Sequence, residues 1–192
     1  MKKLAKVALA GSLLALLIGT VAGATGGGGG SAQLAAQLAD ARFATAEYAT
    51  DLDAAKADGY SLQITPNMPN MGFHFLNPSI GGEFDVTKPP ILVYVKRGSD
   101  WQLGALEWVF AERPDKRPLK GARYGSFPAA CHYADGSFVP AAAEADCAAT
   151  NGGAAFTFWH PRLVTLHVWL WYPNPDGLYA STNPLVAPLT GD

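Results

Sequence analysis

The segment FTFWHPRLVTLHVWLWYPNP, residues 156–175, is rich in aromatic and β-branched residues and contains His160 and His167. Its second part has the composition of a long β-strand, which we expect over Val164–Tyr172. Successive side chains of a strand point to opposite faces of a sheet, so this strand has an apolar row and a mixed row. The mixed row consists of Thr165, His167, Trp169 and Trp171.

Several other segments after Tyr60 have the same character and are bounded by glycine and proline. The expected strands are Ser61–Ile64, Gly72–Leu76, Ile91–Lys96, Trp101–Ala111, Ser137–Val139 and Ala155–Trp159. ADG at 134–136 predicts a hairpin turn, and NPDG at 174–177 predicts the turn that ends the long strand. The connections lack the helical pattern that parallel crossovers need, so we expect a mostly antiparallel sheet.

The segment before Tyr60 is rich in alanine and leucine and contains no proline. Its apolar residues recur at roughly helical spacing: Leu34, Leu38, Phe43, Tyr48, Leu52 and Ala55. This pattern predicts one helix over most of residues 32–58, with Gly59 as its C-cap. The expected fold is therefore α+β and β-rich, with an N-terminal helix packed on a mostly antiparallel curved sheet or open barrel.

The first 24 residues have the layout of a secretory signal peptide. Three lysines precede a short apolar run, and Ala22-Gly23-Ala24 forms a small-x-small cleavage site. An uncleaved N-terminal anchor helix is the alternative. The Gly-rich stretch 25–31 predicts a flexible linker, and residues 32–192 then form a single domain. We therefore expect a secreted, periplasmic or cell-envelope protein without stable membrane insertion after cleavage.

The net charge argues against nucleic-acid binding, and the cysteine content indicates a disulfide bond. Removal of residues 1–24 takes three of the 14 basic residues and none of the 16 acidic ones, so the mature chain is acidic. An acidic domain without a basic run is a poor nucleic-acid binder. The only cysteines, Cys131 and Cys147, are expected to form a disulfide in an oxidising compartment. The chain has no further cysteine to complete the alternative, a zinc site.

Three expected strands each place one ionisable residue opposite an apolar row: His74, Glu107 and His167. Glu107 is surrounded in sequence by uncharged residues, and a carboxylate buried without a partner costs several kcal/mol. Two imidazoles and a carboxylate suit a divalent transition metal such as zinc, copper or iron, and leave coordination positions open. We therefore predict that these three residues, here called the central trio, bind one metal ion.

Structural roles for the same residues stay open at this point. His74 is then a core histidine bonded to backbone, and His167 fills space among tryptophans. Glu107 pairs in that case with an arginine; the available ones are Arg42, Arg123 and Arg162. The trio would then hold the core together without binding a ligand.

Other residues are candidates for the rim or surroundings of the site. His160 precedes Pro161, which is expected to end its strand, so His160 is a fourth ligand, a supporting group or a proton shuttle. His132 precedes the turn at 134–136 and is expected in a loop. Aromatic residues suggest an alternative without metal, a pocket for a small organic or sugar ligand. Tyr94, Trp169 and Trp171 would line that pocket.

Four segments resemble an uncharacterised family of exported bacterial and archaeal proteins: ARFATAEYATDLDAAKADGY, MGFHFLNP, LGALEWVF and LHVWLWYPNPDGLYASTNP. The family motifs are MGxHYxNP and LHxWxWxxNPxG, and the resemblance spans most of residues 40–185. It implies that the central trio falls on motif positions, but it implies no reaction. The segment 131–147 is similar to one branch only, so the resemblance implies no general role for His132 or His160.

The sequence thus favours an exported metal-binding protein with a small-molecule ligand or substrate. If it is an enzyme, hydrolysis and oxidation both suit the expected ligands. No residue is assigned a catalytic role, because the sequence contains no G-x-S-x-G elbow, phosphate loop or free cysteine nucleophile.

Overall fold

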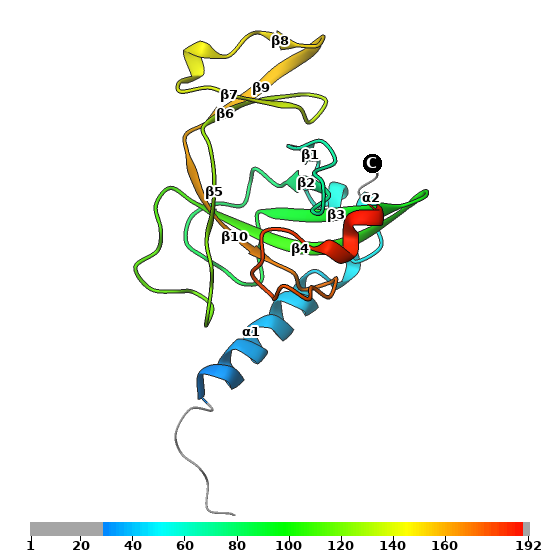
Figure 1. Ribbon diagram of the computed structural model, residues 1–192, viewed down its shortest axis with the longest axis vertical. Helices are drawn as coiled ribbons and strands as arrows, with labels where there is room; N and C mark the ends of the chain where they lie inside the picture. Colours follow the sequence, from blue (N-terminus) through cyan, green and yellow to red (C-terminus); the bar gives the residue numbers. More distant parts are fainter. Residues whose placement is uncertain (1–28, 190–192) are drawn as a thin grey trace, which may run out of the picture.

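A computed structural model describes residues 29–189 as an α+β, β-rich fold with two antiparallel sheets (Figure 1). The predicted signal peptide and the first part of the predicted linker lie outside these residues. The two sheets do not close into a barrel in the described part of the chain. Within residues 29–189, no helix has the length and apolar character needed to cross a membrane.

The N-terminal region contains three short helices, so the prediction of one helix over residues 32–58 was wrong. They are α1 (Gly29–Ala44), the 3₁₀ helix η1 (Ala46–Tyr48) and α2 (Leu52–Ala57). Asp51 begins α2 as its N-cap, because its side chain accepts a hydrogen bond from the Ala54 amide at 2.9 Å. Because α1 begins at Gly29, the last residues of the predicted linker are helical.

The larger sheet has six strands in the order β1-β2-β3-β4-β10-β5. Their bounds are β1 (Leu62–Gln63), β2 (Phe73–Leu76), β3 (Ile91–Arg97), β4 (Asp100–Phe110), β5 (Gly125–Phe127) and β10 (Leu163–Val168). Every neighbouring pair is antiparallel, as predicted. The sequence did not reveal β5, which is short and lies at the sheet edge.

The smaller sheet has four strands in the order β7-β6-β9-β8 and lies at the opposite end of the molecule from α1 (Figure 1). Its strands are β6 (Ala130–Tyr133), β7 (Phe138–Pro140), β8 (Thr150–Asn151) and β9 (Ala154–His160). The expected turn at 134–136 joins β6 to β7, with Gly136 at φ 81°. The predicted disulfide is present between Cys131 and Cys147, and it ties β6 to the segment after the 3₁₀ helix η2 (Glu144–Asp146).

The two faces of the larger sheet bury different sets of side chains. One face packs Leu92, Tyr94, Leu106 and Leu166 against the N-terminal helices. On the other face, Ile91, Val93 and Ala105 form a second apolar cluster with residues of the 3₁₀ helix η3 (Pro184–Leu189) and nearby segments. Because the N-terminal helices cover the first face, they do not cap the face that carries the central trio.

The strand expected over Val164–Tyr172 ends earlier, at Val168. Beyond it, the Trp169 amide donates to the Leu178 carbonyl, while the amides of Trp171 and Tyr172 both donate to the Gly104 carbonyl. This departure from the sheet ladder ends the alternation of side chains. Trp169 and Leu170 still lie on the faces predicted from strand register, but Trp171 and Tyr172 lie on the opposite faces.

Candidate functional site

Strand pairing brings the central trio onto one face of the larger sheet. His167 on β10 lies directly opposite Glu107 on β4, and Glu107 lies opposite Ile91 on β3. His74 on β2 lies opposite Val93, which belongs to the same apolar cluster as Ile91. Residues paired across an antiparallel ladder share a face, so the alternation in the sequence correctly predicted this grouping. All three side chains are buried.

His74 and Glu107 form the closest contact within the trio. His74 Nε2 lies 3.5 Å from Glu107 Oε2. The other ring nitrogen, Nδ1, lies 2.9 Å from Thr65 Oγ1, and the same hydroxyl oxygen accepts the His74 backbone amide at 3.1 Å. Thr65 therefore fixes both the backbone and the ring of His74. None of the ion pairs among the described residues joins Glu107 to an arginine, so the alternative of an arginine salt bridge is not observed.

Burial shifts the acid–base behaviour of this pair towards the neutral forms. Desolvation raises the pKa of Glu107 to about 7, and a hydrogen bond from the Thr165 side chain opposes this shift. Desolvation lowers the pKa of His74 to about 4. Near pH 7, His74 is therefore neutral and Glu107 is partly ionised, so the 3.5 Å contact is not a full ion pair.

His167 is the most unusual member of the trio. Both of its ring nitrogens are buried and have no hydrogen-bond partner among the described residues. Its ring centroid lies 6.2 Å from that of His74 and 4.9 Å from that of Trp169. Burial, followed by the neighbouring His74, lowers the pKa of His167 to about 3. A buried imidazole with no partner loses the solvation of an N–H and a lone pair, so it needs an explanation.

As it stands, the trio is a loose group rather than a formed coordination sphere. No three His, Cys, Asp or Glu side chains between residues 29 and 189 are arranged to hold a metal ion. Two imidazoles on one metal, with metal–nitrogen bonds of about 2.0–2.1 Å, have ring centroids about 5–6 Å apart. The 6.2 Å between the His74 and His167 centroids lies just beyond that range, so coordination requires side-chain rotation.

A cavity of about 350 Å³ lies between the two sheets and includes His74 and Glu107 in its lining. Most of its lining is apolar, including Met68, Met71 and Phe158. This volume suits a small organic ligand. His167, which pairs with Glu107 across the neighbouring strand, does not line the cavity.

The wall formed by the smaller sheet carries the other two histidines, His132 and His160. The prediction that His132 lies in a loop was wrong, because it is a buried residue of β6. A hairpin turn needs a strand on both sides, so the turn at 134–136 was the signal that could have identified β6. His160 is the last residue of β9, just before Pro161, and it lines the cavity.

The aromatic residues predicted around the site are mostly elsewhere. The Tyr94 hydroxyl donates to the Tyr48 carbonyl on the helix-covered face. Trp171 donates to Thr45 Oγ1 and stacks with Arg42, also on that face. Only Trp169 stays beside His167, and its indole donates to the Ala180 carbonyl at 2.8 Å. The predicted pocket lined by Tyr94, Trp169 and Trp171 is therefore not present in the described residues.

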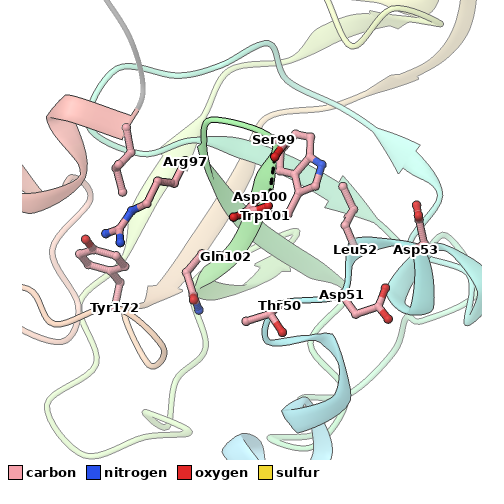
Figure 2. Close-up of a pocket in the computed structure, with 11 residues that line it drawn as sticks. Thr50, Asp51, Leu52, Asp53, Arg97, Ser99, Asp100, Trp101, Gln102 and Tyr172 are labelled. Carbon is pink, nitrogen blue, oxygen red and sulfur yellow. Dashed lines mark hydrogen bonds between the residues drawn. The ribbon is translucent and has the colours of Figure 1, made fainter.

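A second hollow, of about 620 Å³, lies near the turn between β3 and β4 (Figure 2). Its lining is mixed polar and apolar, with Arg97 and Tyr172 on one side and Thr50 and Asp51 on the other. None of the candidate site residues proposed from the sequence lines it. The cavity between the sheets is thus the one that brings the candidate residues together.

Replacement of Thr65 by valine tests how strongly the Thr65–His74 contact supports the site. Valine keeps the shape but leaves the buried His74 amide without an acceptor, so we expect Thr65→Val to lower the free energy of unfolding by about 2 kcal/mol. Urea denaturation measures this. Thr87→Val is the matched control, because it removes an exposed hydroxyl bonded to Asp85. Equal, small effects of the two changes would contradict the role given to Thr65.

Acid should destabilise the metal-free protein through its buried histidines. The pKa values of His74 and His132 are lowered to about 4 and that of His167 to about 3, mainly by burial. Between these values and about 6.5, the unfolded chain binds more protons, so stability falls as pH decreases through this window, by about 1.4 kcal/mol per pH unit for each histidine. Urea denaturation across this range, in EDTA, measures the slope. His167→Phe should reduce it by one histidine's share, and an unchanged slope would contradict the assignment.

Comparison of the chain with models of known protein families, with curated proteins and with solved structures gives no match. The functional conclusion therefore depends on the residues and geometry described above.

Proposed function

We propose that this is an exported metal-binding protein, in which His74, Glu107 and His167 hold one divalent transition metal beside the apolar cavity. The observation that carries the proposal is His167, whose two ring nitrogens are both buried and unpartnered. A metal ion would give one of these nitrogens the partner that the protein does not supply. Its position opposite Glu107, which itself contacts His74, puts three ligands suited to zinc, copper or iron, two imidazoles and one carboxylate, on one sheet face.

Neighbouring residues would orient His74 and favour the ionised form of Glu107, and both effects assist metal binding. Thr65 holds the His74 ring by its Nδ1 edge, which leaves Nε2 directed at Glu107. Thr165 donates a hydrogen bond to the Glu107 carboxylate and so favours the ionised form that binds a metal. When bound, a metal with open coordination positions polarises water or substrate, which suits hydrolysis or oxidation. The apolar lining, including Met68 and Met71, would accept the organic part of a small substrate.

Export and ligand class are part of the same proposal. The N-terminal sequence layout supports secretion, and the Cys131–Cys147 disulfide is consistent with an oxidising compartment. The cavity volume and apolar lining support a small-molecule partner rather than a polymer. We also propose that the chain belongs to the exported family whose motifs it resembles, and that the larger sheet is curved.

The test is the metal content of tag-free mature protein, measured by inductively coupled plasma mass spectrometry before and after incubation with zinc, copper or iron(II). We expect bound metal that decreases by one equivalent in His74→Phe, Glu107→Gln and His167→Phe. Glu112→Gln serves as the control, because Glu112 is exposed and outside the cavity. Near-ultraviolet circular dichroism establishes that each variant is folded. Unchanged metal content in all three folded variants would refute the proposal.

A second candidate, a metal-free binding protein for small organic molecules, is favoured by the cavity itself. Its apolar lining needs no metal to bind a hydrophobic ligand. This function predicts that an apolar fluorescent probe binds equally well in EDTA and in metal, and that enlarging or filling the cavity at Met71 alters its affinity. Binding that requires metal would favour the first proposal instead.

A further inference from the structure

The smaller sheet brings His132 and His160 together in a contact that the central trio does not explain. His160 lies opposite Ala130, and His132 lies opposite Phe158, so the two histidines are diagonal neighbours on strands β6 and β9. Their Nε2 atoms are 3.0 Å apart. Both residues line the cavity, on the wall opposite to His74 and Glu107. We refer to them as the histidine pair.

The other ring nitrogen of each residue determines its tautomer. His132 Nδ1 lies 2.9 Å from the Ile64 carbonyl oxygen, and His160 Nδ1 lies 2.6 Å from the Pro161 carbonyl oxygen. A carbonyl oxygen only accepts hydrogen bonds, so both Nδ1 atoms must carry a proton. In a neutral imidazole the second nitrogen then has a lone pair and no hydrogen. The two Nε2 lone pairs consequently face each other across 3.0 Å.

Two lone pairs at this distance repel each other unless a positive centre lies between them. A metal bound by both nitrogens satisfies the geometry: with bonds of about 2.0–2.1 Å and a bond angle of about 90–110°, the nitrogens are about 2.9–3.3 Å apart. The 3.0 Å separation falls in this interval. An Nδ1–H that donates to a backbone carbonyl, with Nε2 directed at the metal, is also the usual arrangement of metal-bound histidines.

The surroundings hold the histidine pair in place. The His132 ring stacks on Phe158, with centroids 4.6 Å apart and planes 7° apart, and it also packs near Phe127. Cys131, next to His132, is fixed by its disulfide to Cys147. Rigid rings and a covalent constraint reduce the entropy lost on binding a ligand. The pair opens into the cavity, so water or a substrate atom can complete a coordination sphere.

We propose that His132 and His160 form a second metal-binding site, which holds a divalent transition metal such as copper(II), zinc(II) or nickel(II) through their Nε2 atoms. This site is separate from the central trio and faces it across the same cavity. A small molecule bound in the cavity therefore meets metal-binding side chains on both walls. The inference does not depend on the central trio binding metal.

Titration of EDTA-stripped, tag-free protein with copper(II) and with zinc(II), followed by equilibrium dialysis, tests this site. We expect His160→Ala and His132→Gln each to bind one equivalent fewer than wild type, or to bind it at least about tenfold more weakly. Arg162→Ala is the control, because Arg162 is exposed and two residues from His160. Copper(II) electron paramagnetic resonance should show nitrogen couplings that decrease in both histidine variants.

Histidine ¹⁵N nuclear magnetic resonance adds a readout that does not depend on stability. Zinc(II) should shift the Nε2 signals of His132 and His160 in His74→Phe as in wild type, while both Nδ1 atoms keep their protons. If the two Nε2 atoms instead share a proton that saturating zinc does not displace, the inference is wrong. Metal loss in the trio variants alone would support the proposed function and overturn this site. Metal loss in the His132 and His160 variants alone would support this second site and overturn the proposed metal site at the central trio.

Discussion

Glu107→Gln is expected to make the metal-free protein more stable above neutral pH. Burial raises the pKa of Glu107 to about 7, from 4.5 for an exposed carboxyl group. Between these two values the unfolded chain releases a proton that the folded protein keeps, so the contribution of Glu107 to stability falls as pH rises through this window, opposite in sign to the contribution of the buried histidines. The loss amounts to about 3 kcal/mol. Glutamine cannot ionise, and it retains a carbonyl for Thr165 and an amide that can donate to His74.

The expected result is a difference between variant and wild type that is near zero at about pH 4.5 and grows to about 3 kcal/mol by about pH 8. Urea denaturation in EDTA, across this pH range, measures it, with Glu112→Gln as the exposed control. A variant less stable than wild type at alkaline pH would show that Glu107 is ionised and paired with His74. That result would reverse the electrostatic description of the site.

The same substitution should remove the stabilisation that added metal gives. Ligands that bind only the folded state raise the unfolding free energy in proportion to the logarithm of their concentration over Kd. With Glu107 absent, the central trio loses its only anionic ligand, so zinc should raise the melting temperature of Glu107→Gln less than that of wild type. Higher stability without metal, combined with a weaker response to metal, is the signature of a buried carboxylate kept for binding.

The grouping of the central trio could be predicted because it depends on local alternation and on a few strong strands. Once β4 and β10 are strands, register alone puts Glu107 and His167 on one face. The sequence could not give the separation of His74 and Glu107, because that depends on side-chain rotamers and on Thr65. It also could not reveal that His167 is absent from the cavity lining, although it shares a sheet face with His74 and Glu107.

The helix and the end of the long strand were predicted incorrectly for a different reason. Helical spacing continues through residues 45–51, but Thr45 bonds back to the Ala41 carbonyl and Asp51 caps a new helix. Trp171 leaves the strand because Thr45 and Arg42 bind it on the other face of the sheet. Such contacts join residues more than 120 positions apart, so no local pattern predicts them.

The histidine pair escaped prediction because it depends on a short strand and a long connection. His132 and His160 are 28 positions apart, and their contact requires β6 and β9 to pair in the register that puts His132 opposite Phe158 and His160 opposite Ala130. The disulfide was predictable from composition, and its location beside His132 was visible in the sequence. The sequence did not reveal that β6 pairs with β9, because no short turn joins these two antiparallel strands.

Gly72→Ala should be the most damaging small substitution near the site. Gly72 lies just before β2, at φ 109°, and it pairs with Met68 in a tight turn. An added Cβ would overlap the backbone carbonyl oxygen of Tyr94 on the neighbouring strand. Because that obstacle is backbone inside a sheet, it cannot rotate away. The substitution must therefore displace the start of β2, which carries His74.

We expect Gly72→Ala to lower the free energy of unfolding by about 3 kcal/mol or more, the sum of backbone strain and overpacking. Gly82→Ala separates the two effects: Gly82 has a similar φ of 94° with open space around its Cβ position, so it should cost only about 1 kcal/mol. Urea denaturation of both variants measures the difference. If Gly72→Ala cost no more than Gly82→Ala, β2 would not be held against β3 as closely as described. If the larger cost is found, metal binding by the folded fraction of Gly72→Ala can be measured at low temperature. Weaker binding than in wild type would show that the trio needs His74 in its native position to bind metal.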